Sequence, residues 1–194
     1  MLFRSVREVV TERALLSAAG TLYVLPRTNS GGVRSLKPVA THRQRMFDLC
    51  SWRGMLVISG TRADAAAGEH YIRSEDGKTG LWVGDVDDLW KLGKPTGTGG
   101  PWHETNVRAG EPSDPYLMTG FDRKRLTLRH DGSQPVTVTA EVDVAADGKF
   151  VVYQRFVVPA GETFTYVFPE GYAAHWIRLT ADRPCKASAV FYYE

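Results

Sequence analysis

The sequence has little cysteine, little net charge and no long apolar run, and each shortage excludes a class of protein. Two cysteines, Cys50 and Cys185, are too few for a disulfide framework or a zinc site, and their apolar surroundings predict buried free thiols. Lys and Arg number 24 against 22 Asp and Glu, so the net charge of +2 argues against a nucleic-acid partner. The densest basic run, residues 123–125, is interpreted as a solvated strand end. No apolar run approaches the ~20 residues of a membrane span.

The first residues also lack the continuous apolar segment of a secretory signal peptide. The string LFRS is what the codons CTC-TTC-CGA-TCT encode, which resembles the end of a common sequencing adapter. Residues 1–5 are therefore a candidate assembly artefact, and we expect the protein to continue upstream. The compartment stays open, because a secreted or periplasmic location would require a signal peptide in that upstream part.

Aromatic residues make up 11% of the chain and glycines number 19, a mixture typical of many short strands and tight turns. Residues 6–26 allow a helix over 6–19, but the β-branched content and the Ala19-Gly20 pair favour two strands joined by a turn. Residues 37–44 are expected to be extended.

The centre of the chain, residues 41–90, holds the apolar runs FDLCSWRGMLVISG and GLWVGDVDDLW. Arg53-Gly54 predicts a tight turn between two strands, and Asp76-Gly77 is a strong hairpin signal. The continuous MLVIS run is typical of a strand buried on both faces. About four strands in ~50 residues match one β-propeller blade, and residues 6–26 would be the remnant of an earlier blade.

Further along, the composition changes twice. Residues 96–115 are rich in Gly and Pro and predict a connection that packs along a surface, with the domain boundary here. From residue 116, runs rich in Val, Thr and aromatics alternate with turns, which predicts an antiparallel β-sandwich over 116–194. Within it, Val136–Val144 should place alternate residues on one buried face. The fold expected is all-β, with propeller-like strands over 6–95 followed by the sandwich.

Several strings carry a resemblance: LLSAAGTLYVLPR, FDLCSWRGMLVISG, GLWVGDVDDLWKLGKP with GTGGPW, EPSDPYLMTGFD and AAHWIRLTADRPCKASAVFYYE. Together they resemble the C-terminal end of large, mostly uncharacterised bacterial β-propeller proteins, over nearly the whole chain from Val6. The resemblance implies a propeller end followed by a sandwich, and missing upstream blades as partners. Some relatives are thought to bind or act on polysaccharides, which implies a glycan connection by fold analogy. No catalytic motif of that family maps onto this chain, so no residue inherits a role.

One candidate ligand site lies before the central strands. At the start of an inner propeller strand, His42, Arg43 and Arg45 would line the channel mouth and suit an acidic sugar or a carboxylate. The alternative is an Arg–Asp48 pair that fixes a strand end. No residue is predicted to be catalytic, and whether the full protein is an enzyme stays open.

The tryptophans offer a second candidate, because flat rings stack on sugar faces. Trp90 and Trp102, in and near the Gly/Pro stretch, are the candidates for this role. Core packing is the expectation for Trp52, Trp82 and Trp176.

The third candidate is a cation site at Asp85, Asp87 and Asp88, since clustered carboxylates bind Ca²⁺. The spacing departs from the EF-hand loop, which leaves turn capping as the alternative. Ca²⁺ is the one cofactor the sequence suggests.

Three hypotheses follow for the function. In the first, the chain is the C-terminal part of a propeller protein that binds or processes glycans, and the sandwich supports the propeller. In the second, the sandwich is a non-catalytic module that binds carbohydrate or protein. In the third, the chain is a small structural domain without a ligand.

Overall fold

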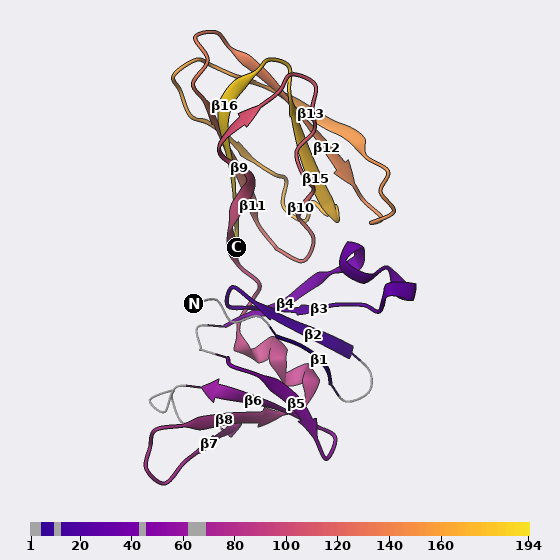
Figure 1. Cartoon of the computed structure of the whole chain (residues 1–194), viewed down its shortest axis with the longest axis vertical. Coiled ribbons are helices and arrows are strands. Elements are labelled where there is room, and N and C mark those ends of the chain that lie inside the picture. The colour runs from indigo at the N-terminus through magenta and orange to yellow at the C-terminus, as the bar shows by residue number, and fades with distance from the viewer. Residues whose placement is uncertain (1–4, 10–12, 43–45, 62–68) are drawn as a thin grey trace. The chain divides into compact units, whose positions relative to one another are not determined.

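The computed structural model describes residues 5–9, 13–42, 46–61 and 69–194, and the chain divides into two compact units, Met1–Pro95 and Thr96–Glu194. The described strands form four antiparallel sheets of four strands each (Figure 1), and none of these sheets closes on itself. The predicted all-β class is therefore confirmed. Among these residues no helix has the length and apolarity that crossing a bilayer requires.

The first sheet of unit 1 has its strands in sequential order, and residues 37–41 are extended as predicted. Ala19 and Gly20 have φ values of 52° and 81°, the two positive angles of a type I′ hairpin turn. This confirms the predicted turn, and the described residues 6–9 and 13–18 lie in strands rather than in the helix considered for residues 6–19. The strands are β1 (Ser5–Val9), β2 (Arg13–Ala18), β3 (Thr21–Val24) and β4 (Lys37–Thr41), with 3₁₀ turns η1 (Thr28–Ser30) and η2 (Gly32–Ser35) before β4.

The second sheet of unit 1 contains both predicted turns of the central stretch. Arg53 and Gly54 have φ values of 50° and 81° between β5 and β6, and Gly77 has φ 68° between β7 and β8. Its order is β5–β6–β8–β7, so β8 lies between β6 and β7 and the order is not sequential. The elements are β5 (Leu49–Trp52), β6 (Met55–Thr61), β7 (Tyr71–Arg73), β8 (Gly80–Gly84) and the following 3₁₀ helix η3 (Val86–Leu92).

These two sheets share one hydrophobic core. Leu15 and Leu22 of the first sheet and Leu56, Ile58 and Trp82 of the second are all 2% exposed or less. The predicted core position of Trp82 is therefore confirmed. The MLVIS run is buried on one face only, because Leu56 and Ile58 face the core while the alternate positions face outward.

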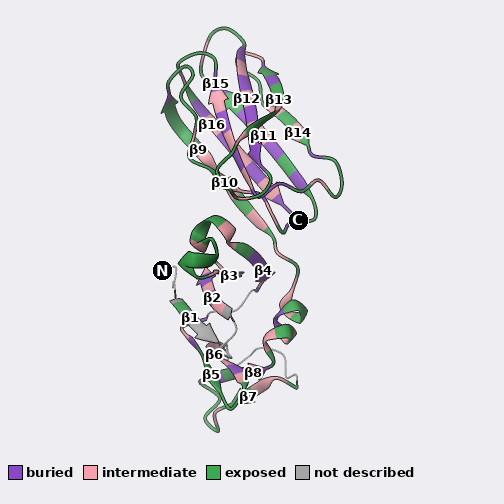
Figure 2. Ribbon diagram, turned by 90° about the vertical axis from the view of Figure 1, so that its right-hand side faces the viewer, coloured by how far each residue is buried: buried purple, intermediate pink, exposed green. Residues whose placement is uncertain are grey.

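Unit 2 is a sandwich of two antiparallel sheets, with strand orders β10–β15–β12–β13 and β14–β11–β16–β9. Buried and exposed residues alternate along most of its strands (Figure 2), as expected for sheets with one face in a core. The strands are β9 (Gly97–Val107), β10 (Tyr116–Leu117), β11 (Lys124–His130), β12 (Val136–Asp143), β13 (Val151–Val158), β14 (Phe164–Val167), β15 (Trp176–Ala181) and β16 (Cys185–Tyr193).

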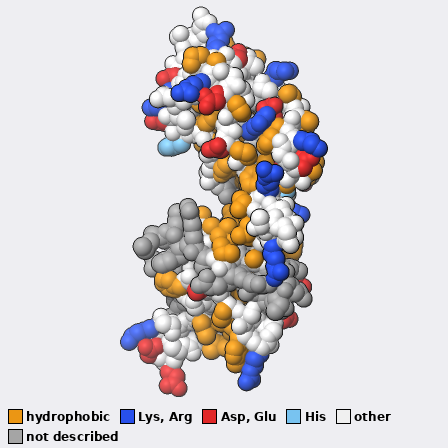
Figure 3. All heavy atoms as spheres, turned by 45° about the vertical axis from the view of Figure 1, so that its right-hand side comes forward, with side chains coloured by type: hydrophobic (Ala, Val, Ile, Leu, Met, Phe, Trp, Pro, Cys, Tyr) orange, Lys and Arg blue, Asp and Glu red, His pale blue; other side chains and the backbone are white. Residues whose placement is uncertain are grey.

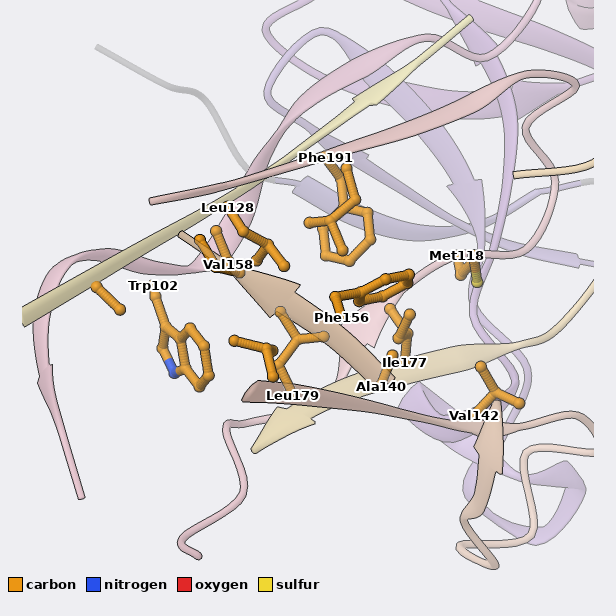
Figure 4. Packing of buried hydrophobic residues seen from close by; sticks show 14 of the residues in the cluster. Trp102, Met118, Leu128, Ala140, Val142, Phe156, Val158, Ile177, Leu179 and Phe191 are labelled. Carbon is orange, nitrogen blue, oxygen red and sulfur yellow. The ribbon is translucent and has the colours of Figure 1, made fainter. Parts of the chain in front are cut away.

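The sandwich core lies between the two sheets, where the labelled side chains of Figure 4 point toward one another. Val136, Val138, Ala140 and Val142 are all buried, which confirms the predicted alternation over most of the strand. Val144 is 62% exposed, because β12 ends at Asp143.

The Gly/Pro-rich stretch 96–115, expected as a connection, contains β9, an edge strand of the sandwich paired with β16. Its glycines allow β9 to lie close to β16 and do not mark a loop. A Cβ on Gly100 would lie 1.8 Å from the Ala189 carbonyl oxygen of β16, so only glycine fits there.

Candidate functional site

The predicted site around His42 is only partly within the described residues. His42 follows β4, is 6% exposed, and its backbone N–H donates to the Gly20 carbonyl at 2.8 Å. Arg43 and Arg45 lie outside the described residues. The imidazole of His42 is thus a buried group of unit 1 rather than part of an open surface.

The three aspartates of the predicted Ca²⁺ site begin η3, and their geometry is that of a helix cap. An Asp88 carboxylate oxygen accepts from the Asp85 backbone N–H at 3.0 Å, and the other accepts from Lys91 Nζ at 2.7 Å. The hydrogen bond from Lys91 lowers the pKa of the Asp88 carboxyl. Within the described ranges, no group of three or more His, Cys, Asp or Glu side chains is placed to hold a metal ion. The geometry therefore supports the capping alternative for Asp85 and Asp88.

The other tryptophans occupy buried and exposed positions that differ in part from the prediction. Trp102 is 4% exposed in the sandwich core, so its ring is not available for stacking on a sugar. Trp90, on η3, is 66% exposed and keeps a ring at the surface. Trp52 is 54% exposed, so its predicted core position is wrong, and Trp176 is only partly buried.

The exposure of Trp52 belongs to a larger feature that the sequence did not reveal, the outward face of the β5–β6–β8–β7 sheet. Cross-strand pairing places its side chains in rows, with Trp52 beside Met55, and Leu81 beside Ile72. Trp52, Ile72 and Leu81 are 54%, 58% and 39% exposed. We call this surface the β5–β8 outer face; its residues are Cys50, Trp52, Met55, Val57, Ser59, Ile72, Leu81 and Val83.

Apolar side chains dominate the β5–β8 outer face, and hydrophobic side chains gather over this part of unit 1 in Figure 3. Phe47, 51% exposed, lies at its margin, where its ring occupies the space that a Cβ on Gly60 would take. A contiguous apolar patch of this kind marks an interaction surface in soluble proteins. Cys50 is exposed there as a free thiol, so its predicted burial is wrong, while Cys185 is half-buried.

The sandwich carries a different surface, an open groove of about 490 Å³ on the outer face of β14, β11 and β16. Arg125 lies between Val167 of β14 and Tyr192 of β16, its paired residues on the two neighbouring strands. The Arg125 guanidinium lies over the Tyr192 ring, with Cζ 4.4 Å from the ring centroid. The groove is lined by Arg123, Lys124, Arg125, Val167, Phe168, Glu170, Tyr192 and Glu194.

The basic run 123–125, interpreted from sequence as a solvated strand end, supplies this groove with two guanidinium groups, those of Arg123 and Arg125. Because side chains alternate along β11, Arg125 faces outward while Lys124 faces inward and is 5% exposed. The Lys124 ammonium donates to the carbonyls of Phe121 at 2.6 Å and Tyr172 at 2.8 Å. Burial lowers the pKa of Lys124.

No family model and no curated protein sequence matches the chain. Among solved structures, a carbohydrate binding module of family 29 aligns with a TM-score of 0.25 and 11% identity, over 76% of this chain and 69% of that chain. A TM-score this low carries no argument about fold or ligand.

Proposed function

We propose that unit 1 is the end of a larger β-propeller and that its β5–β8 outer face docks against a further four-stranded sheet of the same protein. The single observation behind this proposal is the apolar character of that face. Fully burying an aliphatic or aromatic side chain contributes about 1.5–3 kcal/mol, so a face of this composition is stabilised by a covering layer. The MLVIS run, whose composition is typical of a strand buried on both faces, is consistent with such a layer.

The opposite face of the same sheet supports a sheet as the occupant. It is covered by the β1–β4 sheet, through Leu15 and Leu22 packed with Leu56 and Ile58. Stacked four-stranded sheets are the repeating arrangement of a propeller, and the β1–β4 sheet has a sequential strand order.

The outward face of the β1–β4 sheet is also partly apolar. Val6, Leu16 and Tyr23 form one row across β1, β2 and β3, and Val6 is 44% exposed. The two sheets of unit 1 therefore resemble neighbouring layers of a longer stack rather than the two halves of a closed sandwich.

In this proposal the sandwich supports the propeller, and the action of the whole protein on glycans is inferred from the family resemblance. The protein would then work through upstream blades, with this chain in a structural role. Arg43 and Arg45 keep their predicted place at the channel mouth as part of the proposal, whereas His42 is buried and is no longer assigned to it.

A comparison of two chain lengths tests the docking. In a protein extended by the upstream reading frame, Trp52→Ser should lower the free energy of unfolding by about 3–5 kcal/mol, as core truncations do. In the 194-residue chain the same substitution should change it by less than about 0.5 kcal/mol. Trp90→Ser is the matched control, because Trp90 is also exposed, at 66%, but lies on η3 and not on the β5–β8 outer face. Equal costs of Trp52→Ser in the two chains, or an upstream frame without strand repeats, would contradict the proposal.

A second candidate function is that the sandwich is a non-catalytic binding module, and the groove on β14, β11 and β16 favours it. The groove has the size of ligand pockets, which run to about 300–1,000 Å³. It combines cations, carboxylates, an aromatic ring and an exposed aliphatic side chain in one surface. Calorimetric titration of the chain with acidic and esterified oligosaccharides and with an acidic peptide tests this candidate.

A further inference from the structure

We propose that the groove on β14, β11 and β16 binds an acidic oligosaccharide, with Arg123 and Arg125 holding the carboxylate of a uronate residue. The inference rests on the second candidate function, the sandwich as a binding module, and specifies its ligand.

The two arginines of the groove have no acidic partner in the described structure, since no carboxylate there forms an ion pair with Arg123 or Arg125. Other arginines of the sandwich do have such partners: Arg178 contacts Glu141 at 2.9 Å, and Arg108 contacts Glu111 at 3.5 Å. Two guanidinium groups beside a groove are thus free to receive an anion from outside.

Arg125 is stacked on an aromatic ring at the groove. Its guanidinium is stacked on the Tyr192 ring at 4.4 Å, which holds the planar group in place without using its N–H donors. A planar guanidinium forms two parallel hydrogen bonds with a carboxylate. The preferred partner is therefore a carboxylate or a similarly flat anion that approaches along the sheet surface.

The groove lining also contains two carboxylates. Glu170 and Glu194 belong to the groove together with the two arginines, so a dense polyanion such as a nucleic-acid backbone would be repelled. The same carboxylates accept hydrogen bonds from hydroxyl groups. A ligand with separated carboxylates and many hydroxyls satisfies both sets of groups, and a uronate-containing sugar chain has that chemistry.

The groove has an apolar surface beside Arg125. Val167 is paired with Arg125 across β14 and is 67% exposed, so an apolar surface lies next to the cation. The C–H face of a sugar ring suits such a surface. Highly charged inorganic anions would gain nothing from it.

The test is a calorimetric titration of the 194-residue chain with tetragalacturonate, with its fully methyl-esterified form, and with tetra-aspartate as an acidic peptide. We expect binding of tetragalacturonate only, weakened by added NaCl because the contact is ionic. Arg125→Leu should weaken binding about tenfold or more, since it removes the paired hydrogen bonds between the guanidinium and the carboxylate. Arg125→Lys, which keeps the charge but loses the paired donors, should weaken it to an intermediate extent.

Arg129→Leu is the matched control. Arg129 is exposed on the same outward face of β11, but it does not line the groove. Its substitution should leave the affinity unchanged, and thermal unfolding of each variant should show an intact sandwich. Equal loss in Arg129→Leu would overturn the assignment to this groove.

The remaining outcomes separate this inference from the function on which it rests. Equal binding of the methyl-esterified sugar would overturn the acidic ligand but retain the binding module. Binding of tetra-aspartate alone would overturn a sugar ligand in favour of an acidic peptide, again retaining the module. Failure of every probe to bind the folded chain would overturn both.

Discussion

The ammonium of Lys124 donates a hydrogen bond to the Tyr172 carbonyl, 2.8 Å away, and thereby links β11 to the segment that precedes β15. A second hydrogen bond to the Phe121 carbonyl, at 2.6 Å, completes the environment of this buried charge. The next two inward residues of β11, Leu126 and Leu128, are apolar, so the lysine occupies a core position by means of its backbone partners.

Lys124→Met should therefore destabilise the sandwich. The methionine fills similar space but leaves two carbonyls without donors, and an unsatisfied buried polar group costs about 1–3 kcal/mol. The loss of unfolding free energy is measured by urea unfolding, with hydrogen exchange in peptides from residues 116–194 as the readout. Arg129→Met, at an outward position of the same strand, should change the unfolding free energy by less than about 0.5 kcal/mol. Similar losses in the two variants would contradict this account.

Three tyrosines predict a loss of stability in alkali. Burial raises the pKa of Tyr153, Tyr172 and Tyr193, and the hydrogen bond between the hydroxyls of Tyr153 and Tyr166, at 2.8 Å, raises that of Tyr153 further. The unfolded chain loses these protons near pH 10, whereas the folded chain keeps them. The folded state then binds more protons, so its stability, fully present below pH 10, falls as the pH rises above it.

Between its unfolded and folded pKa, each such tyrosine contributes at most about 1.4 kcal/mol per pH unit to this loss. Tyr153→Phe should reduce the slope of unfolding free energy against pH between about pH 10 and 12 by that amount. Denaturant unfolding at half-unit pH steps measures both slopes. Parallel slopes for the two proteins would show that the Tyr153 hydroxyl does not resist ionisation.

Two glycines on β9 offer a matched pair of alanine substitutions. A Cβ at Gly100 would lie 1.8 Å from the Ala189 carbonyl oxygen, and because both groups are backbone, β9 would have to move away from β16. At Gly97 the nearest atom is 3.9 Å away, an ordinary contact. Gly100→Ala should therefore abolish the amide exchange protection of β9, while Gly97→Ala should preserve it. Retained protection in Gly100→Ala would contradict the close approach.

The buried carboxylate of Asp143 organises the turn that follows β12. Its two oxygens accept from the backbone N–H groups of Asp147 at 3.2 Å and Gly148 at 2.8 Å, and the side chain is 2% exposed. Asp143→Ala should cost about 1–3 kcal/mol and increase hydrogen exchange over residues 144–149. The control is Asp147→Ala, because Asp147 is exposed and its carboxylate contacts Lys149, through the backbone N–H at 2.9 Å and through Nζ at 3.3 Å. An unchanged exchange pattern in Asp143→Ala would show that the turn holds without this carboxylate.

The sandwich was predictable from sequence because its signals are local. Alternation from Val136 to Val142 and the turns between runs define the strands without reference to distant residues. In unit 1, the hairpin turns at Arg53-Gly54 and Asp76-Gly77 were predictable for the same reason. The strand content of β9 was not, because glycine signals a loop unless the close approach of Ala189 is known.

The groove could not be predicted because its parts come from distant strands. Arg125 meets Val167 and Tyr192 only through the registers of β14 and β16, which depend on pairing more than forty residues away along the chain. The position of Trp52 was missed for a related reason. Its composition predicts burial, but which face of β5 is covered depends on the partner sheet.

The exposed thiol of Cys50 provides a chemical reporter within the β5–β8 outer face. The other cysteine, Cys185, is half-buried and burial raises its pKa, so an electrophile should alkylate Cys50 first. A maleimide dye attached there would sense the polarity of whatever settles on the β-strands around it. The same sulfur atom would become sheltered from alkylation once a neighbouring layer is in place, giving a reaction rate that distinguishes the bare surface from the assembled protein.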